Sequence, residues 1–256
     1  MLFPVTAAPP GFEWVRVAPT MVLVRTDVRA WVLPMLQDAG RAAAPDGGRD
    51  LAGGRGGARL VTAAEHEVVV RACRRGGLPA RLLHDTYFGW NPRPFRELSA
   101  TETLRQRGAP VVEVYGAAVH WMLPGCYRGS LATRYMPGAH TLWEWARRSS
   151  SAADRVPVFR AVGGALRRLH TSGARHPDLN LNNILVCPGD SATHAPAILF
   201  IDFDRARLMP TAQRAFETDL DRLARSARKL DPRGRSVAAA DLDTLRAAYR
   251  EHGPCA

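Results

Sequence analysis

The pattern of apolar residues changes character about halfway along this chain of 256 residues. In the first half, short runs rich in β-branched residues, such as Glu67–Arg71, predict strands, and a single main helix is predicted over Arg96–Arg107. In the second half, apolar residues recur at helical spacing, as in Val158–His170. We therefore predict an α+β chain of two lobes: a β-rich N-terminal lobe over residues 1–135 and a shortened helical C-terminal lobe over residues 136–256.

The pattern predicts further strands in both halves and further helices in the second half. Strand-like runs occur at Leu60–Thr62, Val111–Tyr115, Ser130–Tyr135, Ile184–Val186 and Ile198–Ile201. Helix-like runs occur at Leu142–Arg148 and Asp219–Leu230, and the second of these is the last element that the pattern predicts. A β-rich front half and a helical back half are typical of a bilobal enzyme with its active site in the cleft.

Composition narrows the classes of function. Hydrophobic residues make up 46% of the chain, which supports a buried core, and no apolar run is long enough to cross a membrane. The N-terminus lacks a signal-peptide pattern, so we expect a cytoplasmic protein. The four cysteines form no C-x-x-C pair, which argues against a zinc ribbon or a redox site. The formal charge of +11 favours anionic partners, but no nucleic-acid-binding signature accompanies it, so we expect no nucleic-acid partner.

The most informative segment is HPDLNLNNIL at residues 176–185. It resembles the catalytic loop of protein kinases, H-R-D-x-x-x-x-N, because Asn183 follows Asp178 by five positions. Phosphoryl transfer needs a carboxylate to orient and deprotonate the attacking hydroxyl, and an amide oxygen to hold magnesium beside the phosphates. We therefore predict Asp178 as the catalytic base and Asn183 as a ligand of Mg²⁺.

A second segment, ILFIDF at residues 198–203, delivers an aspartate next to phenylalanine at the end of an apolar run. It is similar to the metal-binding D-F-G of kinases, so Asp202 is the second predicted Mg²⁺ ligand and ATP the predicted phosphate donor. The alternative is that Asp178 and Asn183 are ordinary turn or helix-cap residues. The two motifs in this order, preceded by the helix Val158–His170, favour catalysis.

A glycine-rich run, GGRGG at residues 53–57, precedes the strand-like segment Glu67–Arg71. Glycine lets the backbone approach phosphate closely, so Gly53, Gly54 and Gly56 are candidates for covering the ATP phosphates. A flexible surface loop is the alternative reading of the same run.

The lysine that kinases place on a strand against the phosphates is missing. The chain contains one lysine, Lys229, and it follows Asp202. The segment VVVR matches the V-A-I-K pattern with Arg71 in the last place, and Glu97 of the segment FREL is the predicted partner of this arginine. Arginine keeps its charge and binds phosphate, although its geometry differs from that of lysine. An ordinary exposed strand arginine is the alternative.

Several parts of a protein kinase that grip a peptide are absent. Little chain follows residue 204, no A-P-E sequence occurs, and Pro177 replaces the arginine that would read a phosphorylated activation loop. Asp204 stands where D-F-G has its hinge glycine, which indicates a less mobile metal loop. These absences favour a small-molecule or glycan substrate.

Further short segments occur in a recognisable order from about residue 70 to 230: RRGGL (74–78), DTY (85–87), FREL (95–98), HPDLN (176–180), IDFD (201–204) and RLxRSxxK (222–229). Together they resemble the 3-deoxy-D-manno-octulosonic acid (Kdo) kinase family, in which Asp-Leu-Asn replaces Asp-Leu-Lys, as Asn180 does here. The resemblance implies a protein-kinase-like fold and transfer of the ATP γ-phosphate to a Kdo hydroxyl on a lipid A precursor in a Gram-negative bacterium.

The resemblance also implies a location and substrate contacts. The expected location is peripheral, on the cytoplasmic face of the inner membrane, with a lipid-linked sugar and an anionic membrane surface as partners. Candidate substrate-binding residues are Asn180, Arg74, Arg75 and Arg81, and Arg222, Arg225 and Lys229 could also face phosphates or the membrane. A solvated basic face is the alternative for the arginines. A heptose kinase, another small-molecule kinase and a non-catalytic pseudokinase remain alternatives for the chain as a whole.

Overall fold

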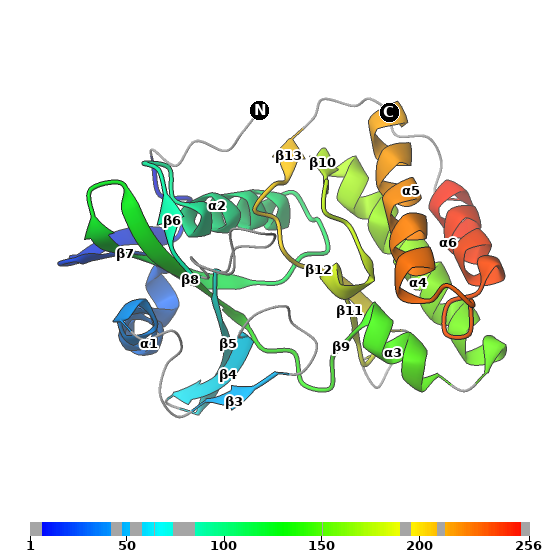
Figure 1. Ribbon diagram of the computed structural model, residues 1–256, viewed down its shortest axis with the longest axis horizontal. Helices are drawn as coiled ribbons and strands as arrows, with labels where there is room; N and C mark the ends of the chain where they lie inside the picture. Colours follow the sequence, from blue (N-terminus) through cyan, green and yellow to red (C-terminus); the bar gives the residue numbers. More distant parts are fainter. Residues whose placement is uncertain are drawn as a thin grey trace. The chain divides into compact units, whose positions relative to one another are not determined.

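The computed structural model describes residues 7–41, 48–51, 58–63, 65–73, 85–149, 151–189, 196–208 and 213–251. The chain divides into two compact units. The N-terminal unit comprises Phe3–Thr103 and Glu113–Tyr135, and the C-terminal unit comprises Leu104–Val112 and Met136–Ala256 (Figure 1). The segment Leu104–Val112 belongs to the second unit because its backbone pairs there: Phe200 N donates to Pro110 O at 2.8 Å and Val112 N donates to Phe200 O at 3.3 Å. A pattern of apolar residues carries no sign of this pairing.

The N-terminal unit is built on one antiparallel sheet with the strand order β1-β2-β7-β8-β5-β4-β3, in which β6 also pairs with β8. The strands are β1 (Phe12–Val17), β2 (Thr20–Arg25), β3 (Arg49–Asp50), β4 (Ala58–Ala63), β5 (His66–Ala72), β6 (Tyr87–Phe88), β7 (Val114–Leu123) and β8 (Cys126–Arg134). The short helix η1 (Thr26–Val28) leads into α1 (Arg29–Arg41), and α2 (Arg93–Gln106) follows β6.

Alternation along the strands explains how this sheet has two buried faces. On β2, Leu23 belongs to one hydrophobic cluster, whereas its neighbours Val22 and Val24 belong to the other. Successive side chains of a strand point to opposite faces, so the two clusters lie on opposite sides of the sheet. Phe95 of α2 packs in the first cluster and Leu36 of α1 in the second, so each helix covers one face (Figure 1).

The C-terminal unit is mainly helical. Its helices are α3 (Leu142–Arg148), α4 (Ala152–Thr171), α5 (Gln213–Leu230) and α6 (Ala239–Glu251), with the short helix η3 (Leu181–Asn183). Its strands are β9 (His140–Thr141), β10 (Ala174–Arg175), β11 (Ile184–Cys187), β12 (Ala197–Phe200) and β13 (Arg207–Leu208); they form the sheets β12-β11-β9 and β10-β13. None of the helices in these described ranges is long and apolar enough to cross a membrane.

Local chemistry fixes where the helices begin and pack. Thr141 and Glu144 form a capping box at the start of α3, since each side chain accepts a hydrogen bond from the other residue's backbone N–H. Further along the chain, α4 lies against α6 at Gly163, where a Cβ atom would come within 2.4 Å of Leu245 O. Only glycine allows this close approach of the two helices.

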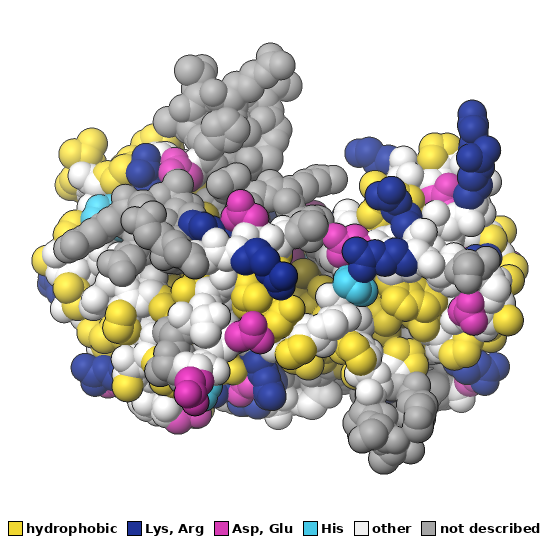
Figure 2. Space-filling view, turned by 90° about the horizontal axis from the view of Figure 1, so that it is seen from below, with side chains coloured by type: hydrophobic (Ala, Val, Ile, Leu, Met, Phe, Trp, Pro, Cys, Tyr) yellow, Lys and Arg dark blue, Asp and Glu magenta, His cyan; other side chains and the backbone are white. Residues whose placement is uncertain are grey.

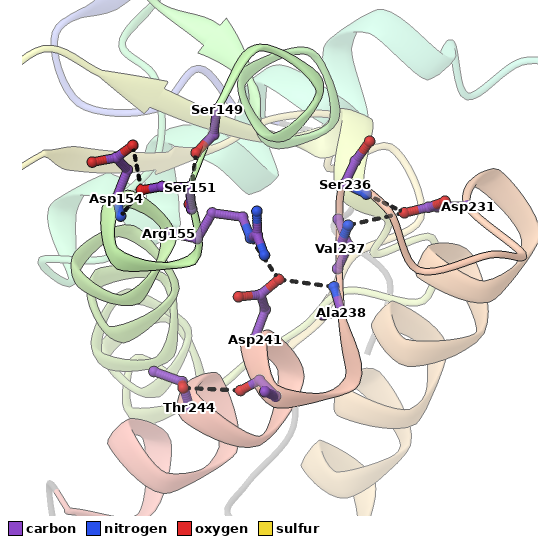
Figure 3. Close-up of polar contacts among 11 residues, drawn as sticks. Ser149, Ser151, Asp154, Arg155, Asp231, Ser236, Val237, Ala238, Asp241 and Thr244 are labelled. Atoms are coloured by element: carbon purple, nitrogen blue, oxygen red, sulfur yellow. Dashed lines mark hydrogen bonds and ion pairs between the residues drawn. The ribbon is translucent and has the colours of Figure 1, made fainter.

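Helix α6 was not predicted from the sequence, and polar contacts explain how it forms. Asp231 accepts hydrogen bonds from the backbone N–H groups of Ser236 and Val237, and these contacts lower its pKa. Asp241 then accepts from Ala238 N at 2.8 Å and pairs with Arg155 of α4 at 2.9 Å (Figure 3). The turn thus places α6 on α4, and a buried ion pair joins them.

We predict that the substitution Asp241→Ala destabilises the protein by about 3 kcal/mol, because it leaves the Arg155 charge buried without this partner and removes the cap at Ala238. The matched control is Asp243→Ala on the same helix, whose exposed side chain pairs with Arg246 and which should change stability by less than about 0.5 kcal/mol. Urea denaturation of the three proteins tests this. Equal stability of the two variants would contradict the assigned role of the ion pair.

Candidate active site

The loop of residues 176–183 connects β10 to β11 and is held by its own side chains. Asn180 accepts a hydrogen bond from Asn182 N at 2.9 Å, which caps the short helix η3. The side-chain nitrogens of Asn180 and Asn183 both donate to Asp178 O, at 2.8 Å and 3.0 Å. These contacts fix the backbone that carries Asp178, whose side chain is 40% exposed.

The same contacts indicate what each asparagine can do. The Asn183 nitrogen is engaged by Asp178 O, so its amide oxygen is the atom that can serve as a ligand. Asn180, a predicted substrate contact, uses its nitrogen and its oxygen inside the loop. Its observed contacts therefore shape the loop.

Asp202 follows the end of β12 by two residues, next to the 176–183 loop. The strands β11 and β12 pair along their length, and Ile201 N donates to Asn183 O at 3.0 Å. The backbone segments that contain Asn183 and Asp202 are therefore neighbours. The backbone of Asp202 has a φ of 71°, a left-handed conformation that costs a residue with a side chain roughly 1–3 kcal/mol. Such strain is retained where the direction of a side chain matters.

His176 connects the two loops and is buried. Its Nε2 lies 3.0 Å from Ile201 O, and because a carbonyl only accepts, this nitrogen carries the proton. Its ring packs against that of Phe203 at a centroid distance of 4.9 Å, and its backbone N–H donates to the Asp219 carboxylate at 2.8 Å. His176 therefore has a structural role, because it holds the two loops together.

Helix α5 holds the 176–183 loop from one side through residues that share one helix face. Besides Asp219, Arg222 donates to Pro177 O, and Ser226 accepts from Leu181 N at 3.4 Å. The spacing of three and four positions places these side chains in a row along the helix. Arg222 was considered from the sequence as a phosphate or membrane contact. In the structure it forms a hydrogen bond with the backbone of the loop.

A second buried histidine extends this arrangement to α6. His170 of α4 lies 2.8 Å from the Tyr249 hydroxyl and 3.6 Å from the Asp219 carboxylate. Burial lowers the pKa of His170 from its usual value near 6.5, although the hydrogen bond and charge of Asp219 act in the opposite direction; Arg167 and His176 lower it further. The imidazole is therefore neutral at pH 7.

Because the pKa of His170 is lowered in the folded state, the unfolded chain takes up this proton first as the pH falls. We predict that the free energy of unfolding decreases as the pH drops below about 6.5, and that His170→Gln weakens this dependence. Urea titrations at several pH values between 7.5 and 5 measure both slopes. Identical slopes for the wild type and the variant would show that His170 does not set this dependence.

One arginine near Asp178 was not anticipated. Arg205 lies with its Nε 3.5 Å from Asp178 Oδ2, and it is 69% exposed. The sequence offered only a weak signal, an arginine directly after the IDFD segment, because the turn that brings residue 205 back to the loop depends on the hydrogen bond from Ala206 N to Phe203 O. An exposed cation beside the predicted base could contact an acidic substrate group.

The N-terminal unit contains the predicted Arg71–Glu97 pair. Arg71 of β5 donates to Glu97 of α2 at 2.5 Å, and the glutamate side chain is only 2% exposed whereas that of the arginine is 31% exposed. A buried carboxylate needs a compensating charge, so this pair joins the strand to the helix. The candidates Gly53, Gly54 and Gly56 lie outside the described residues.

The remaining basic candidates behave differently from one another. Arg74, Arg75 and Arg81 lie outside the described residues. Arg225 and Lys229 are exposed on α5, as is Asp221. In Figure 2, Lys and Arg side chains are visible at several separate places, and acidic side chains lie beside some of them.

The metal-binding capacity of this site depends on few ligands. Across the residues that the structure describes, no cluster of three or more His, Cys, Asp or Glu side chains could hold a metal ion. Asn183 and Asp202 instead offer one amide oxygen and one carboxylate from adjacent loops. Magnesium commonly binds through one or two carboxylates together with substrate phosphates and water, so this donor set fits Mg²⁺ bound with a nucleotide.

Comparison with known proteins reveals relatives over most of the chain. Residues 49–249 match the family described as "Lipopolysaccharide kinase (Kdo/WaaP) family". A 3-deoxy-D-manno-octulosonic acid kinase of Xylella fastidiosa (strain M12) is 36% identical over 203 residues, which cover 77% of this chain and 76% of that protein. A kinase of the same name from Xanthomonas axonopodis pv. citri (strain 306) is 35% identical over 204 residues, which cover 77% of each protein.

A solved structure is similar over nearly the whole chain. It is titled "WaaP in complex with acyl carrier protein", and it matches with a TM-score of 0.55 and 17% sequence identity over 95% of this chain and 90% of that one. At this identity the likeness concerns the fold alone. It confirms the α+β, protein-kinase-like fold that was predicted from the sequence.

Proposed function

Because the chain belongs to the lipopolysaccharide kinase (Kdo/WaaP) family, we propose that it transfers the γ-phosphate of ATP to a hydroxyl group of the Kdo sugar in the lipopolysaccharide core. The observation that carries this function is the family match, which runs from residue 49 to 249. It includes the Arg71–Glu97 pair and both loops with Asp178 and Asp202.

In this proposal Asp178 is the catalytic base. Its exposed carboxylate orients the acceptor hydroxyl and takes its proton as the oxygen attacks the γ-phosphorus. The new bond joins the sugar oxygen to phosphorus while the bond between the β- and γ-phosphates breaks and ADP leaves. The hydrogen bonds from Asn180 and Asn183 to Asp178 O support this role, because they hold the base in one position.

Asn183 and Asp202 are the proposed Mg²⁺ ligands. Bound with ATP, magnesium would neutralise charge on the β- and γ-phosphate oxygens. The left-handed backbone of Asp202 and the engaged nitrogen of Asn183 support the assignment, because both direct an oxygen toward a ligand role.

Arg71 takes the proposed place of the missing lysine at the ATP phosphates. The buried Glu97 carboxylate orients the guanidinium, and the arginine remains exposed enough to reach a ligand. Gly53, Gly54 and Gly56 are proposed to lie over the phosphates, and Arg74, Arg75 and Arg81 to contact the acidic acceptor.

The proposed location is the cytoplasmic face of the inner membrane in a Gram-negative bacterium. ATP is a cytoplasmic donor, and a Kdo acceptor built on lipid A is anchored in the bilayer, so both substrates meet only at that surface. A peripheral contact with anionic lipid would suit the formal charge of +11.

We predict that Asp178→Asn and Asp202→Asn each lower kcat at least about 100-fold, because the first removes the base and the second removes a charged metal ligand. Phosphate transfer from labelled ATP to a purified Kdo–lipid A precursor measures this, with a heptose-terminated core as the competing acceptor. Asp221→Asn, at an exposed position of α5, is the control and should retain wild-type activity.

Full activity of both active-site variants would exclude the proposed roles. Phosphate found on heptose and not on Kdo would keep the site assignment and change the acceptor.

For the phosphate contact, we predict that Arg71→Met raises the KM for ATP at least about tenfold and lowers stability by about 3 kcal/mol, because Glu97 is left buried without this charge. Arg71→Lys should retain more activity than Arg71→Met, since lysine keeps the positive charge, although it lacks the paired N–H donors of the guanidinium. The control is Arg29→Met, which breaks the exposed Arg29–Glu13 pair of the same unit. An unchanged KM in Arg71→Met would contradict the phosphate role.

A further inference from the structure

The N-terminal unit displays a cluster of large apolar side chains at one end of its sheet. Trp90 is 76% exposed, Leu123 68% and Phe88 58%, and Met122 and Val17 are exposed to a lesser degree. These are five of the six large hydrophobic side chains that are exposed in the described part of the chain. We call Val17, Phe88, Trp90, Met122 and Leu123 the aromatic tip.

Strand pairing makes the aromatic tip continuous. Cys126 of β8 pairs with Phe88 on one side and with Leu123 on the other, so the apolar side chains of β6 and β7 flank the same strand. Trp90 lies over Gly125 of the β7–β8 turn, where a Cβ atom would meet its ring at 3.5 Å. The tip is therefore formed around one turn.

The neighbouring β1–β2 turn extends the same surface. Trp90 and Trp121 approach with ring centroids 6.0 Å apart, and Trp121 N donates to Pro19 O at 3.2 Å. Val17 lies just before that turn. In Figure 1 the β1–β2 and β7–β8 turns lie at the same end of the sheet of this unit.

A rigid base supports the aromatic tip. Tyr87 and Tyr127 are buried and stack at 5.6 Å, and Gly89 N donates to Gly125 O at 2.8 Å. The turn at Pro124-Gly125 has a φ of 72° at the glycine, which matches a type II turn with proline before glycine. The exposed rings are thus presented in place, so binding a partner requires little additional ordering.

The charged residues around the aromatic tip are mainly basic. The segments 15–21, 86–93 and 114–128, which build it, contain no aspartate or glutamate, but they contain Arg16, Arg93 and Arg128. Two acidic residues directly precede these segments: Asp85 is paired with Arg128 at 3.2 Å, and Glu113 is paired with Arg25 and Arg134. Exposed Trp and Phe flanked by arginine are typical of segments that lie in the headgroup region of a bilayer, where the rings reach the acyl boundary and the cations meet anionic lipid.

We propose that the aromatic tip inserts into the surface of an anionic bilayer and so holds the chain at the membrane. The proposal rests on the proposed function for its purpose, because only a lipid-linked acceptor requires the enzyme at this surface. The surface itself is defined by exposure, continuity and charge, independently of the acceptor.

Vesicle binding tests the surface directly. The full-length chain is mixed with vesicles of phosphatidylethanolamine and phosphatidylglycerol, or of phosphatidylcholine alone, and sedimented. We expect the wild type to bind the anionic vesicles, and the variant Trp90→Ser/Leu123→Ser to bind them at least about tenfold more weakly, since two large apolar groups no longer enter the bilayer. The matched control is Val156→Ser, which changes the sixth exposed hydrophobic residue, located on α4.

Circular dichroism and gel filtration establish that the variants are folded and monomeric to the same extent as the wild type. A wild-type chain that remains in the supernatant, or a Trp90→Ser/Leu123→Ser variant that binds like Val156→Ser, would overturn the proposal. So would a wild-type dimer that this double substitution dissociates without any vesicle binding, because the tip would then face a second copy.

Kinetics separate this inference from the proposed function. With a deacylated, water-soluble Kdo acceptor, Trp90→Ser/Leu123→Ser should match the wild type, whereas with the lipid acceptor in anionic vesicles it should be at least about tenfold slower. Equal rates on the vesicle acceptor would contradict the inference. A wild-type protein that phosphorylates neither acceptor but binds vesicles through the aromatic tip would contradict the proposed function and still support the membrane-binding role of the tip.

Discussion

The buried carboxylate of Asp219 organises the part of the C-terminal unit that carries the candidate site. It has no exposed surface, and a carboxylate removed from water is stable only where hydrogen-bond donors or cations surround it. The backbone N–H of His176 supplies one donor, and His170 and Arg175 lie within 3.6 Å and 3.7 Å. The loop with Asp178 is therefore drawn to α5 by the requirement to satisfy this charge.

The N-terminal unit uses the same physical device once more. Glu97 is a buried carboxylate on α2, and its pairing with Arg71 ties that helix to β5. In each unit a buried acid on a helix fixes the position of a group that the proposed chemistry needs: the loop with the base in one, the phosphate-binding cation in the other. Replacing lysine by arginine is compatible with this arrangement because the guanidinium can donate to the carboxylate and still present N–H groups to a ligand.

Both candidate loops and most of the helices could be predicted from the sequence, because they depend on short local patterns of residues. The segments 176–185 and 198–203 were recognisable since phosphoryl transfer constrains residue types at fixed spacing, and the strand β5 and helices α2 to α5 follow their apolar periodicity. Arg71 and Glu97 were predicted partners, and the structure places them in contact.

What could not be predicted depends on contacts between distant segments. Helix α6 was missed because its start relies on Asp231 and Asp241 capping a turn, and its position relies on Gly163 allowing a close helix contact. Arg222 was considered as a phosphate or membrane contact, because the spacing of residues along a helix does not show that its guanidinium donates to Pro177 O. The long β7–β8 hairpin, and with it the aromatic tip, was predicted only as two short strands, because its small residues, such as Gly116 and Ala118, carry little strand signal.

The most direct test of the account is the turnover number of the variant Asp219→Ala, compared with Asp221→Ala two positions away on the exposed side of α5. If Asp219 positions the loop, kcat should fall about 100-fold or more in a folded protein while the KM for ATP changes less than about threefold, since a displacement of about 1 Å is enough to lose this much rate. A folded Asp219→Ala protein with the kcat of the wild type would contradict the claim that this buried carboxylate holds the catalytic base in place.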